Sequence, residues 1–461
     1  MHPTPLHPTD DTIVALSTPL GRGAIGLVRL SGPESLKIAR SVFRARGRAR
    51  IRHAHSAFGT ILSRDDSGEI DSGYLTYYRA GRSYTGEDVV ELTCHGSPIV
   101  IERILEELIR SGARAARPGE FTYRAVLNGR LDLAQAEGVR DLIDATTADA
   151  ARVARDQIRG GLSRRIGTLK DALVEIISRG EAAVEFAEEP DVAEGPGRTH
   201  LERRLDTLTA DLEALLATWR RGRLLKEGAT VVIAGRPNAG KSSLFNRLLQ
   251  RDRAIVAPLP GTTRDYLTEC LDLAGIPVSL VDTAGLRETG EAIESQGVAM
   301  TRRLTGQADL VLVLVACDDH VTAEDDAFIA SLARAPVVVA SKSDLRNGHP
   351  LPSPGGHDPI AVSAKTGDGV DALFSRIVSR LADAPALSHG EAIVCDVRHQ
   401  QALSHCHERL KAARAAAATG VSEEIFLVDL YAALRHLEEI TGTVTMDAIH
   451  ERIFSTFCVG K

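Results

Sequence analysis

One stretch of eight residues has the composition and spacing of a phosphate-binding loop. "GRPNAGKS", from Gly235 to Ser242, matches G-x-x-x-x-G-K-[ST], follows the strand-like run "TVVIA" and opens the helical run "SSLFNRLLQ". Its glycines would let backbone N–H groups curl around a β-phosphate, Lys241 would reach the β- and γ-oxygens, and the Ser242 hydroxyl would ligate Mg²⁺. The pattern predicts a nucleoside triphosphate site, with loop contacts from Asn238, Ala239, Gly240, Lys241, Ser242 and Ser243.

Two later segments predict the γ-phosphate and metal contacts of the same site. "PGTTRD" supplies Thr262 and Thr263 as candidates to reach the metal when a γ-phosphate is present, and we take Ser242 and Thr263 as the Mg²⁺ ligands. "DTAG" follows the apolar run "VSLV", which places its aspartate at a strand end beside Mg²⁺ and its glycine near the γ-phosphate. The residues of this segment expected at the nucleotide are Asp282, Thr283, Ala284 and Gly285.

Two more segments predict that the base is guanine. In "SKSD", Asp344 can accept from the guanine N1 and N2 hydrogens while the Lys342 stem packs over the ring. In "SAK", made of Ser363, Ala364 and Lys365, the Ala364 N–H can donate to guanine O6. Adenine has an amino group in place of O6 and lacks the N2 donor, so these segments select GTP. Ser341 stands where such GTPases have asparagine, which bears on the strength of the base pocket rather than its identity.

The residue after "DTAG" raises a question about hydrolysis. In Ras-type GTPases a glutamine at this position orients the attacking water. Here the residue is Leu286, which can neither donate nor accept a hydrogen bond. Either the chain binds a nucleotide without cleaving it, or another group orients the water. The carboxylates of Glu288, Glu291 and Glu294 are candidates, and the residue types alone do not choose among them.

The predicted secondary structure and the amino-acid composition change from one segment of the chain to the next. Residues 11–125 alternate short β-rich runs with a helical run, which predicts an α+β domain. Residues 229–384 contain four apolar β runs separated by helical stretches, which predicts an α/β domain. The segments between and after these two domains are Ala/Leu/Arg/Glu-rich and helical, with a break expected at Gly160–Gly161. We therefore expect one discontinuous helical bundle with the α/β domain inserted into it.

The expected fold class is a multidomain chain of α/β and all-α domains. The predicted domains are an N-terminal α+β domain (1–130), a first helical segment (131–224), a Ras-like P-loop GTPase domain (225–384) and a second helical segment (385–461).

Composition narrows the class of protein further. The chain has 461 residues and a net charge of −7, so bulk electrostatics does not indicate a nucleic-acid binder. No apolar run approaches the roughly 18 residues of a membrane span, and the first residues lack the apolar core of a signal peptide, so a cytoplasmic location without a membrane partner is expected. Six cysteines without C-x-x-C spacing indicate reduced, mostly buried thiols.

Three other patterns are weaker. "GRGAIG", from Gly21 to Gly26, is a formal dinucleotide-binding pattern, but the strand-like "LVRLSG" that follows argues against it because such a loop must open a helix. "HCHERL", from His405 to Leu410, resembles a metal motif, yet adjacent helical residues point in different directions. The arginine-rich residues 40–55 are more often a solvated surface than a strip that contacts phosphates.

Several segments taken together resemble the tRNA-modification GTPase family of the MnmE (TrmE) type. The segments are "GEFTYRAVLNGRLDLAQAEGVRDLIDA", "GRPNAGKSSLFNRLL", "PGTTRD", "DTAGLRE" and the terminal "FCVGK". The resemblance covers essentially the whole chain. Its most specific portions are the GEFT…DLAQAE block and the last five residues, since the GTPase motifs are shared widely.

The resemblance implies an activity and partners. The N-terminal domain would bind 5-formyl- or 5,10-methylene-tetrahydrofolate and form a homodimer. With a separate FAD-dependent partner protein of the MnmG/GidA type, in a heterotetramer, the chain would place an aminomethyl-type group, often carboxymethylaminomethyl, on C5 of the tRNA wobble uridine.

The resemblance also implies an answer to the question at Leu286. In this family K⁺ sits where other GTPases receive an arginine finger, and two GTPase domains face each other when GTP is bound. By position, the K⁺ ligands fall on Asn238, Ala257, Leu259 and Thr262. Glu294 would orient the water, and Arg264 joins it as a catalytic residue.

By the same resemblance, the C-terminal residue would close a one-carbon pocket. Folate contacts would come from Arg29, Glu91, Arg130 and Lys461, with Arg130 standing where lysine is common. Cys458 would be a catalytic thiol on a short, mobile C-terminal extension; from its residue type alone, a core thiol is the more common role.

Two other functions remain open at this stage. A regulatory or ribosome-assembly GTPase would share the nucleotide site, but the "GRGAIGLVRLSG" block and the "FCVGK" tail favour one-carbon chemistry, which a pure switch does not need. A nucleotide-stabilised scaffold without turnover rests only on Leu286.

Overall fold

In the computed structural model, the chain forms two compact units. The first contains Met1–Arg140, Gln157–Lys170 and Leu434–Lys461, and the second contains Asp141–Asp156 and Asp171–Ala433. The structure describes residues 10–47, 50–63, 68–185, 198–251, 267–282, 294–346, 348–381, 392–419, 423–442, 453–454, 457–458 and 460.

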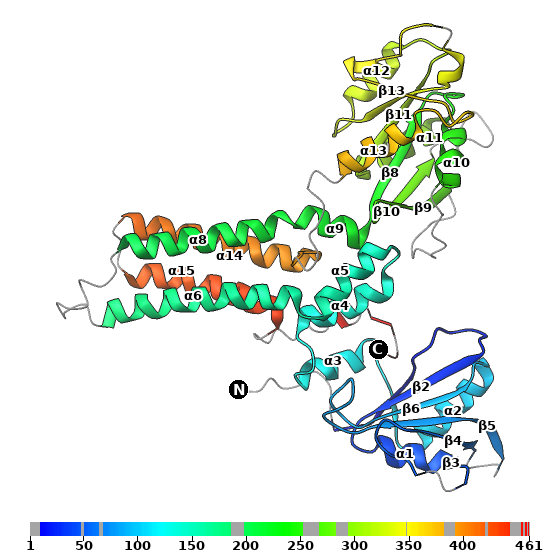
Figure 1. Cartoon of the computed structure of the whole chain (residues 1–461), viewed down its shortest axis with the longest axis vertical. Coiled ribbons are helices and arrows are strands. Elements are labelled where there is room, and N and C mark those ends of the chain that lie inside the picture. The colour runs from blue at the N-terminus through cyan, green and yellow to red at the C-terminus, as the bar shows by residue number, and fades with distance from the viewer. Residues whose placement is uncertain are drawn as a thin grey trace. The chain divides into compact units, whose positions relative to one another are not determined.

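A seven-stranded sheet forms the centre of the first unit, with the strand order β3-β4-β5-β6-β2-β1-β7 (Figure 1). The strands are β1 (Ile13–Leu16), β2 (Ile25–Ser31), β3 (Phe43–Ala45), β4 (Ser56–Leu62), β5 (Glu69–Tyr78), β6 (Val89–His95) and β7 (Arg114–Ala115). Helices α1 (Ser35–Val42) and α2 (Pro98–Arg110) share one apolar core with these strands. Each observed neighbour pair is antiparallel except β1 and β7, which run parallel.

Side-chain alternation explains why this sheet has a buried face. Along β4, Ala57 and Ile61 are buried while Phe58 between them is exposed, as expected for a strand with one face on a core. "GRGAIG" leads into strand β2 and not into a helix, which confirms the expected local structure there.

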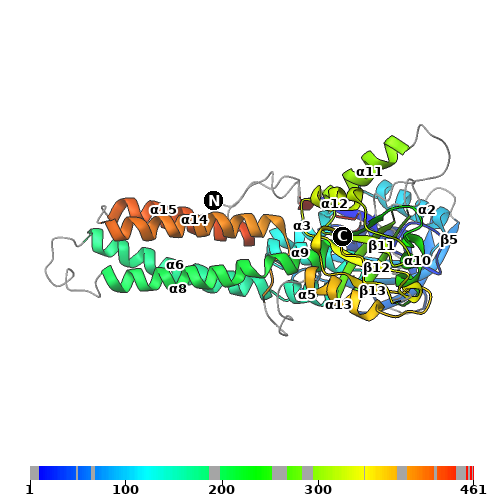
Figure 2. The same ribbon diagram turned by 90° about the horizontal axis from the view of Figure 1, so that it is seen from above.

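Long helices from distant parts of the sequence pack together in the second unit. The helices are α4 (Leu133–Asp144), α5 (Ala148–Ile158), α6 (Gly161–Glu185), α8 (Arg198–Ala217), α9 (Trp219–Glu227), α14 (Val397–Thr419) and α15 (Glu423–Thr441), of which α4, α5, α6 and α15 run into both units. Figures 1 and 2 show α8 beside α14 and α6 beside α15. This arrangement confirms the discontinuous helical domain.

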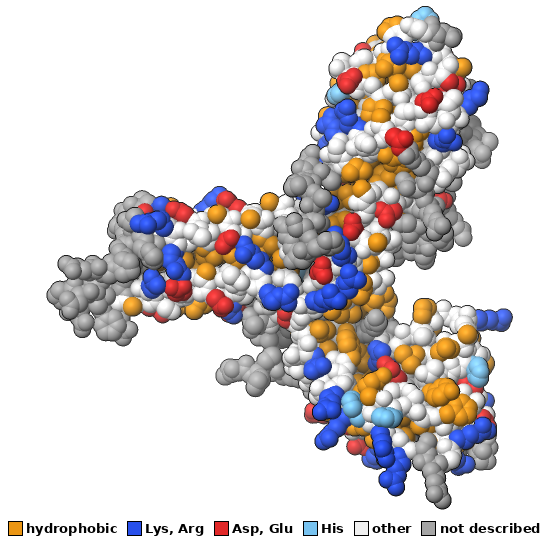
Figure 3. Space-filling model, in the orientation of Figure 1, with side chains coloured by type: hydrophobic (Ala, Val, Ile, Leu, Met, Phe, Trp, Pro, Cys, Tyr) orange, Lys and Arg blue, Asp and Glu red, His pale blue; other side chains and the backbone are white. Residues whose placement is uncertain are grey.

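Polar contacts join these helices along their surfaces. Arg414 of α14 pairs with Asp206 of α8 at 2.9 Å, and Tyr431 of α15 donates to Glu181 of α6. Figure 3 shows basic and acidic side chains interspersed along the helices. Cys406 is fully buried while its neighbour His407 pairs with Glu213 at 2.8 Å, so "HCHERL" is divided between the core and the surface.

Gly160 separates α5 from α6, as predicted for this glycine pair. Its φ of +77° is in the left-handed region, and α5 ends at Ile158 before α6 begins at Gly161. At the other end of this region, α9 continues to Glu227 and is capped at Gly228. The predicted boundary between residues 224 and 225 therefore falls inside a helix.

A six-stranded sheet with the order β13-β12-β11-β8-β10-β9 follows α9. Its strands are β8 (Ala229–Gly235), β9 (Leu267–Leu273), β10 (Ile276–Asp282), β11 (Leu310–Ala316), β12 (Val337–Ser341) and β13 (Ile360–Val362). All neighbours run parallel except β9 and β10. The associated helices are α10 (Lys241–Arg251), α11 (Glu294–Gln307), α12 (Ala323–Ala330), α13 (Val370–Leu381) and the short η2 (Ser343–Leu345) and η3 (Pro354–Gly356).

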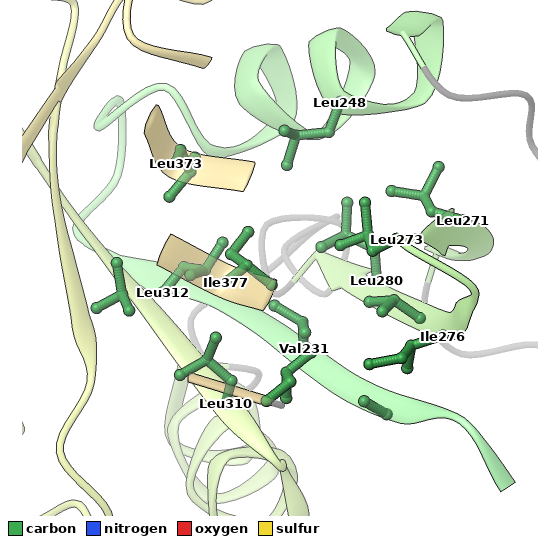
Figure 4. Packing of buried hydrophobic residues seen from close by; sticks show 14 of the residues in the cluster. Val231, Leu248, Leu271, Leu273, Ile276, Leu280, Leu310, Leu312, Leu373 and Ile377 are labelled. Carbon is green, nitrogen blue, oxygen red and sulfur yellow. The ribbon is translucent and has the colours of Figure 1, made fainter. Parts of the chain in front are cut away.

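Helices cover both faces of this sheet, which confirms the predicted α/β domain. Leu248 of α10 and Leu373 and Ile377 of α13 pack on one face against side chains such as Leu312 (Figure 4). Leu304 of α11 and Ile329 of α12 pack on the other face. Because β8 and β11 are buried on both faces, they read as continuous apolar runs rather than alternating ones.

The structure also shows the state of the cysteines and the character of the helices. Five cysteines are buried and free, and Cys458 is exposed, which confirms the expectation of mostly buried thiols. Within the described ranges, no helix combines the length and the apolar character that crossing a membrane requires.

Candidate functional site

The phosphate loop lies between β8 and α10, at the carboxyl end of the central strand. A Cβ at Gly235, whose φ is +147°, would lie 2.5 Å from the Leu314 carbonyl oxygen, so only glycine lets the two strands approach there. Asn238 and Gly240 have left-handed φ values of +62° and +84°. The loop therefore turns back on itself immediately before the first residue of α10, as the spacing predicts.

The lysine and the serine of the loop have defined partners. Lys241 is 8% exposed, and its Nζ donates to the carbonyl oxygens of Gly235 at 3.0 Å and Arg236 at 2.8 Å. Ser242 Oγ donates to Asp282 Oδ2 at 2.8 Å. The Lys241 ammonium group is thus bound to the backbone of its own phosphate loop.

Asp282 lies beside Ser242 because β10, which ends at Asp282, is the neighbour of β8, which leads into the loop before Ser242. Asp282 is fully buried as the last residue of β10, opposite Ile233 of β8. A hydroxyl and a carboxylate oxygen are the hard ligands that Mg²⁺ takes in proteins. The two residues that the sequence places at one metal ion therefore lie in contact and fit that ion.

The residues predicted to read guanine gather at the ends of β12 and β13. Lys342 directly follows β12 with a φ of +53°, and its Nζ pairs with Asp318 at 3.0 Å. Ser363 Oγ donates to Asp344 Oδ1 at 2.7 Å and accepts from the Thr366 N–H at 3.1 Å. These contacts hold the Asp344 carboxylate at the turn that contains Ala364 and Lys365.

A cavity of about 220 Å³ lies beside the phosphate loop. Its lining comes from the loop, the end of β11 and the start of the base region: Arg236, Pro237, Asn238, Ala239, Leu314, Val315, Ala316, Asp318, Asp319 and Lys342. The cavity therefore connects the predicted phosphate and base contacts.

Several positions of the predicted nucleotide site lie outside the described residues. These positions are Ala257, Leu259, Thr262, Thr263, Arg264, Thr283, Ala284, Gly285, Leu286, Glu288 and Glu291. Glu294 is the first residue of α11, and the structure describes its backbone only.

The predicted one-carbon site contains a pair of charged residues on adjacent strands. Arg29 of β2 lies directly opposite Glu91 of β6, and its Nη2 and Nε donate to Glu91 Oε1 at 2.7 and 3.0 Å. The two side chains are only 16% and 21% exposed. The pair is thus mostly shielded from solvent.

The last residues of the chain reach this pair. The Gly460 carbonyl oxygen accepts from Ser17 Oγ at 3.0 Å and from Arg29 Nη1 at 3.5 Å. Two residues earlier, Cys458 is an exposed residue, and its carbonyl oxygen accepts from the Gly119 N–H at 3.4 Å. Lys461 itself is outside the described residues of the chain.

Aromatic packing fixes the tail on the GEFT block. Phe454 and Phe457 are buried, and Phe454 lies edge-on to Tyr123 with ring centroids 5.2 Å apart. Gly119, the first residue of "GEFT", has a φ of +67°, and a Cβ there would lie 2.7 Å from the Phe454 carbonyl oxygen. The described portion of the tail is therefore anchored through its phenylalanines, and the mobility expected for the segment that carries Cys458 stays a prediction.

Arg130 has other contacts. It is exposed, and its Nη1 donates to the Gly81 carbonyl oxygen at 3.4 Å. Its stem lies near Gly86 in the same loop. Arg130, which follows α3, therefore packs against the loop before β6, whereas Arg29 and Glu91 lie within the sheet.

A buried charge network supports this region, and sequence reasoning missed it. Arg124 of α3 (Glu120–Leu127) is 1% exposed and contacts Asp11 at 2.5 Å, Glu87 at 3.2 Å and Glu120 at 3.2 Å. Arg114 contacts Asp11 at 2.6 Å and Glu120 at 2.5 Å. Charged residues inside the otherwise apolar run "EFTYRAVL" were the available signal, because buried charges must be paired.

The network shifts the ionisation of its members. Burial raises the pKa of Glu120, but hydrogen bonds from Arg114 and the Arg117 backbone outweigh burial, so the net pKa of Glu120 is lowered. Burial likewise opposes the charge of Arg124, yet its carboxylate neighbours raise its pKa overall. Glu120 and Arg124 are therefore both charged at neutral pH.

The fold and the sites define a P-loop nucleotide-binding domain of the Ras-like class, inserted into a helical domain that follows an α+β domain. A family model described as "GTP-binding protein TrmE N-terminus" matches residues 12–130, and one described as "MnmE helical domain" matches residues 133–458. The second match spans the inserted domain.

Full-length relatives agree with these matches. The protein named "tRNA modification GTPase MnmE" from Koribacter versatilis is 42% identical over 98% of this chain and 99% of the relative. The proteins of the same name from Heliobacterium modesticaldum and Aquifex aeolicus are 43% and 41% identical over 98% of this chain and 99% and 100% of their own lengths. The chain belongs to the MnmE family of tRNA modification GTPases.

Solved structures resemble portions of the chain. Aquifex aeolicus Era bound to GDP and AlF4− is 21% identical with a TM-score of 0.27, covering 39% of this chain and 66% of that chain. The G domain of the T. maritima FeoB iron transporter is 24% identical with a TM-score of 0.24, covering 33% of this chain and 98% of that chain.

Proposed function

We propose that this chain hydrolyses GTP and acts with a partner protein to modify the wobble uridine of tRNA. The observation that carries this proposal is the joining of two sites in one chain: a guanine-nucleotide site in the inserted domain, and the Arg29–Glu91 pair with the C-terminal tail in the first unit. A GTPase that acts only as a switch needs the first site and not the second.

The nucleotide site would bind GTP with Mg²⁺. Ser242 and Asp282, together with Thr263, would hold the ion, which when bound neutralises charge on the β- and γ-phosphate oxygens. Lys241 would swing from the loop carbonyls to the phosphates, since both positions are within reach of one flexible side chain. Asp344 would select guanine.

Hydrolysis without the usual glutamine needs other groups. We propose that Glu294 orients the attacking water, with Arg264 also taking part, and that K⁺ is held by Asn238, Ala257, Leu259 and Thr262. A monovalent cation beside the bridging oxygen stabilises the charge that develops on the leaving group. Pairing of two GTPase domains would close the site.

The one-carbon site would bind a tetrahydrofolate through Arg29, Glu91, Arg130 and Lys461, with Cys458 as the reactive thiol. The contact between Arg29 and Gly460 supports the idea that the C-terminal tail contributes to the site on β2 and β6. With an FAD-dependent partner of the MnmG/GidA type and as a homodimer, the chain would add an aminomethyl-type group, such as carboxymethylaminomethyl, to C5. We also propose that the N-terminal domain ends at residue 130 and the GTPase domain at residue 384.

Mass spectrometry of nucleosides from cellular tRNA tests this function. Cells that lack the chain should lose the C5-modified wobble uridine, and the wild-type gene should restore it. Cys458→Ser should fail to restore the modification while it leaves GTP turnover within about twofold of wild type, because Cys458 is not among the groups of the GTP site. Normal modification without the chain would leave the regulatory GTPase as the better description.

A further inference from the structure

Ser341 is the last residue of β12 and is only 5% exposed. Its backbone is fixed from both sides, because it pairs with Ala316 of β11 and Val362 of β13. Its carbonyl oxygen also accepts from the Cys317 N–H at 2.8 Å. The side chain therefore starts from an immobile part of the sheet.

The hydroxyl of Ser341 reaches across to the phosphate loop. Its Oγ donates to the carbonyl oxygen of Ala239 at 2.6 Å, and both atoms are buried. Ala239 lies between Asn238 and Gly240, whose φ values of +62° and +84° are in the left-handed region. The hydrogen bond from Ser341 therefore holds the loop between its two left-handed residues.

This bond fixes the direction of a phosphate-binding group. In a trans peptide the C=O and the following N–H point in opposite directions. Because the Ala239 carbonyl points at Ser341, the Gly240 N–H points away from β12. Backbone N–H groups of such loops cradle phosphates, so the serine holds one of them in place before any nucleotide arrives.

We infer that Ser341 is a positioning residue of the phosphate loop: its hydroxyl sets the affinity for the diphosphate part of the nucleotide and leaves base selection to Asp344 and Ser363. The inference rests on the proposed binding of guanine nucleotides. Without the hydroxyl, the Ala239 carbonyl can turn to solvent in the empty protein, and binding must then order the loop again. That ordering lowers affinity for every nucleotide that carries the same phosphates.

The matched variants are Ser341→Thr and Ser341→Val, whose side chains have the same shape and differ in one hydroxyl. We expect Ser341→Thr to bind GDP more tightly than Ser341→Val by about tenfold, as for loss of one buried hydrogen bond. Competition against a fluorescent GDP analogue gives the Kd values for GDP and IDP, and both affinities should fall by the same factor. Ser341→Ala should resemble Ser341→Val, and Ser341→Asn, which again offers a donor, should bind at least as well as Ser341→Thr.

Thermal unfolding without nucleotide separates positioning from a purely structural role. We expect the Tm values of Ser341→Thr and Ser341→Val to lie within about 2 °C of each other, because the freed carbonyl is hydrated in the empty state. Equal GDP affinities of this pair, a changed IDP-to-GDP ratio, or a large Tm loss with an unchanged Kd would each overturn the inference. If the wild-type chain binds no GDP, the proposed function fails instead.

Discussion

At the scale of single residues, the carboxylate of Asp344 is expected to choose the base. Its Oδ1 accepts from Ser363 Oγ at 2.7 Å, which leaves Oδ2 to accept from the base. Asp344→Asn replaces that acceptor by a donor. We expect GDP affinity to fall by roughly tenfold or more and XDP affinity to rise, because xanthine carries an acceptor at that position.

Asp368→Asn is the matched control for this prediction. Asp368 is exposed in the same turn and accepts from Thr366 Oγ1 at 2.7 Å, so the same change of atoms occurs outside the expected base contact. Competition binding with GDP and XDP measures both variants. An unchanged preference for GDP over XDP in Asp344→Asn would show that another group reads the base.

At the scale of elements, the β9–β10 hairpin connects the nucleotide site to helix α5. β10 ends at Asp282, and the opposite end of the hairpin turns at Ala274 and Gly275. There Thr147 Oγ1 donates to the Gly275 carbonyl oxygen at 2.7 Å, and Val153 of α5 enters the core of the sheet. Gly275 has a φ of +84°, and a Cβ on it would lie 2.7 Å from Asp149 Cβ.

Gly275→Ala should therefore destabilise the second unit. We expect a loss of roughly 1–3 kcal/mol in the free energy of unfolding, from the left-handed backbone and from overlap with the start of α5. Gly348→Ala is the control, because Gly348 has a φ of +81° but nothing within 4 Å of the added Cβ. Denaturant unfolding measures both, and equal losses would mean that contact with α5 contributes nothing.

The charge network around α3 predicts how the first unit responds to acid. Burial opposes ionisation of Asp11 and Glu120, but contacts with Arg114 and Arg124 leave the pKa of both carboxyls below their ordinary values of 3.8 and 4.5. A lowered pKa in the fold means that the stabilisation is complete above these ordinary values. It is lost as the pH falls from about 4.5 downward through the folded-state pKa.

Glu120→Gln isolates one member of this network. At neutral pH we expect it to cost about 3 kcal/mol, because Arg114 and Arg124 lose a buried partner. Below pH 4.5 its stability should fall less steeply with pH than that of wild type, because one titrating group is gone.

Hydrogen exchange of peptides from β2 and β6 measures the stability of the first unit alone. Glu102→Gln, at an exposed position on α2, should match wild type throughout, and equal acid slopes in all three proteins would contradict the network's role.

At the scale of the whole molecule, the sequence predicted the fold class and the nucleotide loop well because both depend on local patterns. The doubly buried strands β8 and β11 read as apolar runs, and the spacing from Gly235 to Ser242 fixed a strand–loop–helix unit. Asp282 could be placed beside Ser242 because parallel strands end at the same edge of a sheet. The break at Gly160 was visible because glycine pairs interrupt helices.

Contacts between distant residues left no comparable pattern. Arg124 meets Asp11 across 113 positions, and Thr147 meets Gly275 across 128, so neither partner marks the other in the sequence. The anchoring of the tail was missed for the same reason: Phe454 and Phe457 enter a core formed with Tyr123 and Leu133. Ser341 looked like a weakened base contact because its bond to Ala239 depends on how β12 lies against the loop.

Hydrolysis that depends on K⁺ and on pairing of GTPase domains can be tested by phosphate release from GTP, measured in KCl and then in NaCl at a series of protein concentrations. The proposed site lacks the usual glutamine and instead takes its cation and its closure from pairing of two GTPase domains. We predict turnover that is fast in KCl, slow in NaCl and higher per molecule as the protein concentration rises. Glu294→Ala should lower kcat in KCl by roughly a hundredfold with GTP affinity kept. Equal rates in both salts at all concentrations, or bound GTP that is never cleaved, would contradict this account.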